Sequence, residues 1–210
     1  MEMSMSQHGW YGAAAGYLGM WMAMMVPMML PALIPMLSRY RRSVCGVERM
    51  QLHGLTVLVG AGYFAVWAGL GAATYAGSVS LMAAEMRWGE IARWLPAATG
   101  LLLVAAGAVQ LTPWKARQLG LCRTGAGCRG APASNAAAAW RHGWHLGVQC
   151  SLCCTGLMLA LVTVGMMNLV ATAAVTLVIS AERLAPVPLR VARIAGVTIV
   201  MLGVLTIAGR

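Results

Sequence analysis

The sequence predicts an all-α polytopic membrane protein: a bundle of six transmembrane helices whose N-terminus and C-terminus both lie outside. Composition points to this fold class, because 60% of the 210 residues are hydrophobic and only 10% are charged. Charged residues make up roughly 25% of an ordinary soluble domain. Apolar stretches of about 20 residues, the length that crosses the hydrocarbon core of a bilayer, recur along the chain. The mean hydropathy of +0.74 agrees with both observations.

The first apolar stretch, residues 12–38, follows a short polar segment. We expect residues 1–11 to be extended on the extracytoplasmic side. We expect residues 12–38 to remain as the first helix, because they are too long for the core of a cleaved signal peptide and no basic segment precedes them. Three prolines, each four residues after the last, remove backbone donors from this helix: Pro27, Pro31 and Pro35. The first helix should therefore bend.

The second and third helices are expected at residues 52–75 and 94–113. Both contain glycines that let neighbouring backbones approach closely, at positions 60, 62, 69 and 71 and at positions 100 and 107. A basic cytoplasmic loop rich in glycine and alanine, residues 114–140, follows the third helix. It should stay irregular until Ser134 or Asn135, either of which can cap the next helix.

The apolar stretch from residue 143 to residue 182 is too long for one ordinary membrane helix. The sequence GMMN at residues 165–168 interrupts it near the middle, and a turn there gives two helices at about 143–163 and 167–182. A sixth helix at 189–208 completes one transmembrane domain, residues 12–208.

Basic residues set the expected orientation. With the N-terminus outside, twelve of the fifteen lysines and arginines fall in cytoplasmic loops, which leaves Arg87, Arg93 and Arg210 outside. The net charge of +10 therefore reflects topology and anionic lipid headgroups, and it gives no support to nucleic-acid binding. We expect a multi-pass protein of the bacterial inner (cytoplasmic) membrane, with the lipid bilayer as its main partner.

Three cysteines in the sequence CSLCC, residues 150–154, are the most specific chemical feature of the chain. On a helix, Cys150, Cys153, Cys154 and Met158 place four sulfur atoms within an arc of about 140° on one face. Sulfur is a soft ligand that selects Cu(I) over harder ions. The same cysteines are also consistent with buried packing or with a redox pair at the Cys150-x-x-Cys153 spacing. The redox reading is disfavoured because the expected outer loops contain no cysteine.

Methionine supplies further soft ligands, since the chain contains 17 of them. Met24 and Met25 lie near the middle of the first helix, so a mixed site with the cysteines would form near the bilayer midplane if the first and fourth helices touch. Residues suited to ion entry or hand-off lie nearer the membrane surfaces: Met1, Met3, Met5 and His8 outside, and Cys122, Cys128 and His142 on the cytoplasmic side. Methionine also fills apolar space and chain termini are often disordered, so packing and disorder remain alternatives.

Several motifs occur together between roughly residues 16 and 200. They are MWMAMMVP in the first helix, QLTPWK at 110–115, GVQCSLCCTGLM at 147–158, GMMNL at 165–169 and the pair Glu182–Arg183. Their order resembles an uncharacterised bacterial family of predicted metal-binding integral membrane proteins with a C-x-x-C-C transmembrane motif. The resemblance implies a metal site that includes Cys150, Cys153 and Cys154. Gln118 and Thr155 depart from the family pattern, which has cysteine and tryptophan there; the first departure weakens a metal site in the loop.

We therefore predict a membrane protein that binds a soft transition metal, copper, and acts in its transport or delivery. One alternative is an accessory subunit of a larger membrane enzyme, such as a copper-dependent oxidase or monooxygenase. A membrane thiol-redox protein is a third possibility. Larger enzyme subunits or a second copy of the chain are the expected protein partners. The sequence contains no phosphate-binding loop, Ser/His/Asp set or paired carboxylates, so no catalytic residue is assigned.

Overall fold

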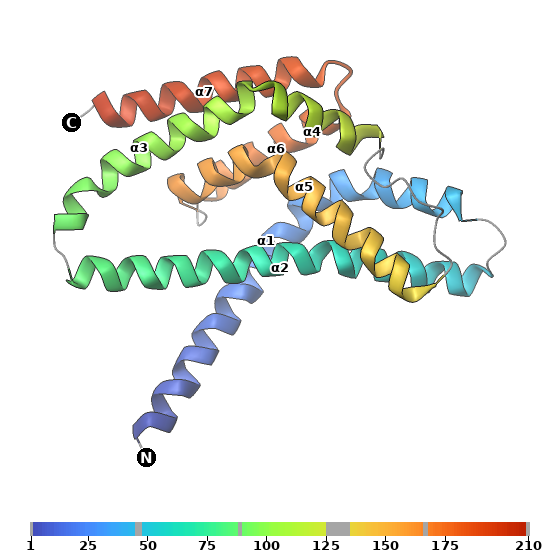
Figure 1. Ribbon diagram of the computed structural model, residues 1–210, viewed down its shortest axis with the longest axis horizontal. Coiled ribbons are helices and arrows are strands. Elements are labelled where there is room, and N and C mark those ends of the chain that lie inside the picture. The colour runs from blue at the N-terminus through green and yellow to red at the C-terminus, as the bar shows by residue number, and fades with distance from the viewer. Residues whose placement is uncertain (1, 45–47, 88–89, 125–134, 166–167, 209–210) are drawn as a thin grey trace. The chain divides into compact units, whose positions relative to one another are not determined.

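The computed structural model describes residues 2–44, 48–87, 90–124, 135–165 and 168–208, with side chains for all of these except 2–10, 90–96 and 123–124. Within these ranges the chain forms helices and no strands, which confirms the all-α class (Figure 1). The helices are α1 (Glu2–Ser43), α2 (Arg49–Arg87), α3 (Glu90–Leu111), α4 (Pro113–Thr124), α5 (Ala136–Val164), α6 (Leu169–Leu184) and α7 (Pro188–Ala208).

The expectation of six membrane-spanning helices is wrong. Among the described residues four helices are long and apolar enough to cross a bilayer: α1, α2, α5 and α7. The bent pair α3 and α4 makes a fifth if its two segments are counted as one span. With 16 residues, α6 is about 24 Å long at 1.5 Å per residue, which is shorter than the roughly 30 Å hydrocarbon core. The orientation of the two termini remains a prediction.

Two segments that were expected to be irregular are helical. The backbone of the N-terminal segment belongs to α1, which begins at Glu2, so the extended conformation expected for this segment is wrong for residues 2–11. The loop expected at 114–140 contains α4, which begins at Pro113 and meets α3 at an angle of 64°. Proline fits the first position of a helix, where its missing N–H costs nothing. The Thr112 hydroxyl donates to the Val109 carbonyl at 2.7 Å across the break.

Helix α5 starts and ends at the predicted signals. The Asn135 side chain accepts a hydrogen bond from the Ala138 amide at 2.9 Å, which caps the helix as expected. At the other end Gly165 has φ = +106°, a conformation that only glycine adopts readily. Asn168 then caps α6 by accepting from the Val170 and Ala171 amides. The predicted interruption of the long apolar stretch is confirmed.

The first of two compact units contains α1, α2 and the start of α5 up to Gly147. Two long side chains of α1 bond to α2: the Trp21 indole N–H donates to the Trp67 carbonyl at 2.9 Å, and the Tyr17 and Thr74 hydroxyls lie 3.1 Å apart. Gly62 of α2 packs against the α5 backbone, where an added Cβ would lie 2.6 Å from the Trp140 carbonyl oxygen. The close approach predicted for this glycine is confirmed.

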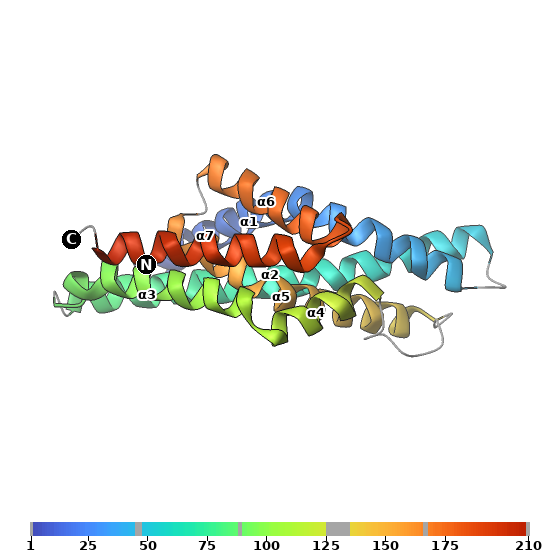
Figure 2. The same cartoon turned by 90° about the horizontal axis from the view of Figure 1, so that it is seen from above.

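The second unit contains α3, α4, α5 from Val148 onward, α6 and α7. Helices α3 and α7 lie side by side in both views (Figures 1 and 2). Glycine makes this contact possible. A Cβ at Gly107 would lie 2.7 Å from the Gly196 carbonyl oxygen, and a Cβ at Gly203 would lie 2.9 Å from the Gly100 carbonyl oxygen.

Two other glycines, Gly60 and Gly69 of α2 in the first unit, face open space. The packing role expected for these two glycines is therefore wrong.

Candidate metal centre

The three cysteines of CSLCC lie on the buried face of α5. Cys150, Cys153 and Cys154 are each at most 1% exposed, whereas Leu152 between them is 41% exposed. The 3.6-residue period of the helix explains this arrangement, since residues three and four apart share a face. Met158 follows on the same face one turn after Cys154 and is half-buried.

A fourth cysteine comes from α4. Cys122 is buried, and its thiol donates to the Gln149 carbonyl at 3.4 Å. The thiol of Cys153 is in hydrogen-bonding contact with those of Cys122 and Cys154, and Cys154 is in the same kind of contact with Cys150. The four thiols, all free of disulfide bonds, form a continuous series in the order Cys122, Cys153, Cys154, Cys150. We call this series the thiol chain.

Arg183 of α6 contacts the thiol chain at Cys150 and Cys154. Its Nη2 donates to Cys150 Sγ at 3.1 Å and lies 4.0 Å from Cys154 Sγ. The side chain is only 8% exposed, and its Nη1 has no hydrogen-bond partner among the described residues. A buried guanidinium requires a nearby negative charge. This contact therefore favours an anionic centre at the two sulfurs.

A second buried network lies next to the thiol chain and joins four helices. Lys115 of α4 donates to a Glu182 carboxylate oxygen of α6 at 2.7 Å and to the Cys153 carbonyl of α5 at 2.7 Å. Gln110 of α3 donates to the other Glu182 oxygen at 3.0 Å. The lysine and glutamate side chains are 1% and 2% exposed. The network fixes α5 at Cys153 and neutralises its own charges.

Arg183 and Lys115 have functions that the sequence analysis did not assign. Lys115 was expected in a cytoplasmic loop and is instead buried in an ion pair. Glu182 and Arg183 are neighbours on α6, about 100° apart around the helix, so they face different partners. The sequence signal was an acid and a base directly after an apolar stretch, where charges are costly unless paired.

Comparison with known protein families identifies the chain. A family model described as PpoB2, copper chaperone, matches residues 18–206. The chain belongs to this copper chaperone family. No curated protein and no solved structure matches it. The family supports the predicted link to copper.

The thiol chain fits the ion that the copper chaperone family handles. Among the described residues no group of three or more histidine, cysteine or carboxylate side chains is arranged to hold a metal ion. The thiols meet in successive pairs and do not converge on one centre. Paired sulfur ligands suit Cu(I), a soft d¹⁰ ion that is stable with two thiolates, and do not suit structural zinc, which takes four ligands.

The remaining predicted metal residues lie elsewhere. Met24 and Met25 belong to α1 in the first unit, where Met25 is fully buried and Met24 is half-buried. A mixed site between them and the cysteines remains a prediction. His142 lies in the first unit at a centroid distance of 5.2 Å from the Tyr40 ring. Met1 and Cys128, and the side chains of Met3, Met5 and His8, fall outside the described part of the chain.

Proposed function

We propose that this member of the copper chaperone family is a membrane-embedded carrier that holds Cu(I) as cargo between the thiolates of Cys150 and Cys154. The observation that carries the proposal is the contact of a buried guanidinium with both sulfurs, at 3.1 and 4.0 Å. Cu(I) bound by two thiolates has a net charge of −1. Arg183 supplies the +1 that makes the loaded centre neutral, which a site of low dielectric constant requires.

The thiol chain suggests how the ion moves. Each thiol contacts the next, so Cu(I) passes from one pair of sulfurs to an adjacent pair by exchanging one ligand at a time. The ion then never leaves sulfur coordination. Cys122, on the short helix α4, is the end of the series opposite Cys150. Delivery to a recipient protein at Cys122 requires a local opening, because this side chain is buried.

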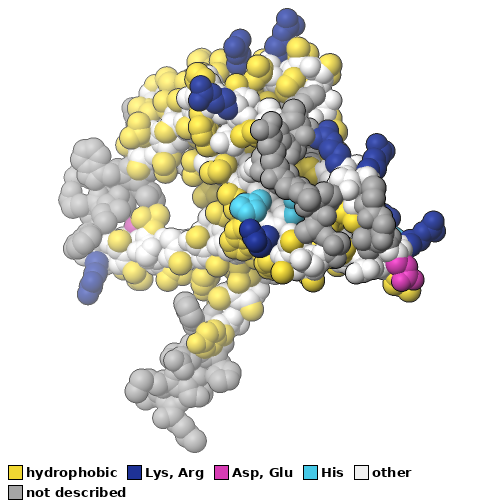
Figure 3. All heavy atoms as spheres, turned by 45° about the vertical axis from the view of Figure 1, so that its right-hand side comes forward, with side chains coloured by type: hydrophobic (Ala, Val, Ile, Leu, Met, Phe, Trp, Pro, Cys, Tyr) yellow, Lys and Arg dark blue, Asp and Glu magenta, His cyan; other side chains and the backbone are white. Residues whose placement is uncertain are grey.

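The exposed surface supports a location in the bilayer. Hydrophobic side chains cover much of the face shown in Figure 3, and lysine and arginine side chains are scattered over it. Large apolar residues on the candidate spans are strongly exposed, among them Val57 at 72% and Ile34 at 59%. Buried ionisable groups within such a protein commonly mark the path of an ion.

Metal content and affinity test the proposal. The protein is purified in detergent under reducing conditions and loaded with Cu(I), and bound copper is measured by elemental analysis after removal of excess ion by a competing chelator. We expect retained copper in the wild type and loss in the variant Cys150→Ser/Cys154→Ser. Ser151→Ala is the matched control, because the Ser151 hydroxyl donates to the Val148 carbonyl of its own helix. Equal copper in the double variant and the wild type would refute the assignment.

A further inference from the structure

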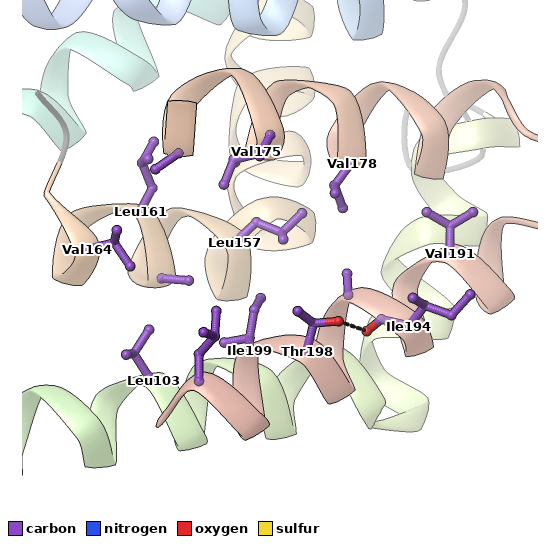
Figure 4. A pocket seen from close by; sticks show the side chains of 15 residues that line it. Leu103, Leu157, Leu161, Val164, Val175, Val178, Val191, Ile194, Thr198 and Ile199 are labelled. Atoms are coloured by element: carbon purple, nitrogen blue, oxygen red, sulfur yellow. Dashed lines mark hydrogen bonds between the residues drawn. The ribbon is translucent and has the colours of Figure 1, made fainter. Parts of the chain in front are cut away.

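The second unit contains an apolar cavity separate from the thiol chain. It has a volume of about 390 Å³ and lies between α3, α5, α6 and α7 (Figure 4). Leu157 and Leu161 of α5, Val175 and Val178 of α6 and Ile199 of α7 are among the residues that line it. This volume falls within the range of specific small-molecule sites, about 300–1,000 Å³.

The chemistry of the lining restricts the occupant to hydrocarbon. All lining residues are aliphatic except Thr198. The Thr198 hydroxyl donates to the Ile194 carbonyl at 2.9 Å within α7, a bond drawn in Figure 4. A polar ligand would lose its hydrogen bonds to water and gain none here, at a cost of several kcal/mol.

A positively charged side chain lies at one end of the row of cavity-lining residues on α7. Ile194 and Thr198 both line the cavity, and Arg190, one turn earlier, continues their row because residues four apart share a face. Arg190 is exposed and lies in the first turn of α7, which begins at Pro188. Arginine at the end of an apolar helix is suited to binding anionic headgroups. Arg193 lies about 100° from Ile194 around the helix and lines a separate cavity with Gln110 and Lys115.

We propose that this cavity binds one acyl chain of an anionic phospholipid whose phosphate pairs with Arg190. An apolar tail and an anionic head match the aliphatic lining and the arginine at the end of its row. The lipid holds α6, which is too short to cross the bilayer alone, against α5 and α7. The site depends on membrane embedding and is independent of copper.

Native mass spectrometry of the full chain from nanodiscs tests the proposal with two matched pairs of variants. Ala174 lines the cavity and its exposed neighbour Ala173 does not, so Ala174→Phe should reduce retained phosphatidylglycerol several-fold while Ala173→Phe leaves it unchanged. In nanodiscs of mixed phosphatidylglycerol and phosphatidylcholine, Arg190→Gln should abolish the preference for the anionic lipid and Arg193→Gln should preserve it. Circular dichroism confirms that each variant is folded, and Ala174→Leu replaces the phenylalanine variant if that one is not.

Several results would overturn the assignment. Equal lipid retention by the Ala174 and Ala173 variants would show that the cavity holds no chain. Equal retention of both lipids by the wild type, or equal effects of the two arginine variants, would exclude the headgroup contact. A wild-type dimer that dissociates on Ala174→Phe would show that a second copy of the protein fills the cavity.

Discussion

Replacement of Arg183 by methionine should weaken Cu(I) binding without removing a ligand. A single negative charge shared by the sulfurs of Cys150 and Cys154, 3.1 and 4.0 Å from Nη2, attracts the guanidinium by about 5 kcal/mol at an effective dielectric constant of about 20. Water that enters the vacated space screens part of this lost attraction. We expect a net loss of about 2–3 kcal/mol, or Cu(I) binding weakened roughly 30- to 150-fold. Arg183→Lys keeps the charge and should lose less.

The assay is competition with a chromophoric Cu(I) chelator, carried out anaerobically on detergent-purified protein. Arg193→Met is the matched control, because Arg193 is an exposed arginine of the same unit that lines a separate cavity. Unchanged affinity in Arg183→Met would refute the charge-balance argument. An equal loss in both variants would show that only the overall positive charge matters.

Three further predictions concern stability, measured by denaturant unfolding in detergent. Lys115→Met leaves the buried Glu182 carboxylate without its cation and should lower the free energy of unfolding by about 3–5 kcal/mol. Adding Glu182→Gln should recover more than half of this loss, and no recovery would contradict the pairing. Gly107→Ala should destabilise the protein because the added Cβ would lie 2.7 Å from a carbonyl oxygen of α7, whereas Gly120→Ala, where the added Cβ enters open space on α4, should stabilise it by about 0.5–1 kcal/mol. A change of the same sign in both variants would contradict the packing described for α3 and α7. Gly165→Ala should cost about 1–2 kcal/mol because φ is +106° there, and a neutral effect would exclude a need for glycine in the turn.

Helix content and several boundaries could be predicted from local signals. Asn135 and Asn168 cap helices through their own side chains, and Gly165 ends α5 through its backbone conformation. Such interactions involve residues close in sequence. The number of spans could not be predicted, because composition does not distinguish a short apolar helix such as α6 from a membrane-crossing one. The break between α3 and α4 at Thr112 was missed because Pro113 was treated as the end of a helix and not as the start of another.

The candidate metal centre was predictable on α5 and unpredictable elsewhere. The face formed by Cys150, Cys153 and Cys154 follows from helical periodicity alone. Arg183 and Cys122 join it only through tertiary contacts between residues that are 27 and 33 positions apart in the sequence. Lys115 illustrates the same limit, since an isolated lysine in a basic segment looks like a solvated charge until its partner Glu182 is placed.

X-ray absorption at the copper edge of the loaded protein tests copper carriage by the thiol chain. We expect Cu(I) with a first shell of sulfur only, from two thiolates, in the wild type. In Cys150→Ser/Cys154→Ser this sulfur shell should be lost or weakened while the Ser151→Ala spectrum stays that of the wild type. A first shell of nitrogen or oxygen, or an unchanged spectrum in the double cysteine variant, would contradict copper carriage by the thiol chain.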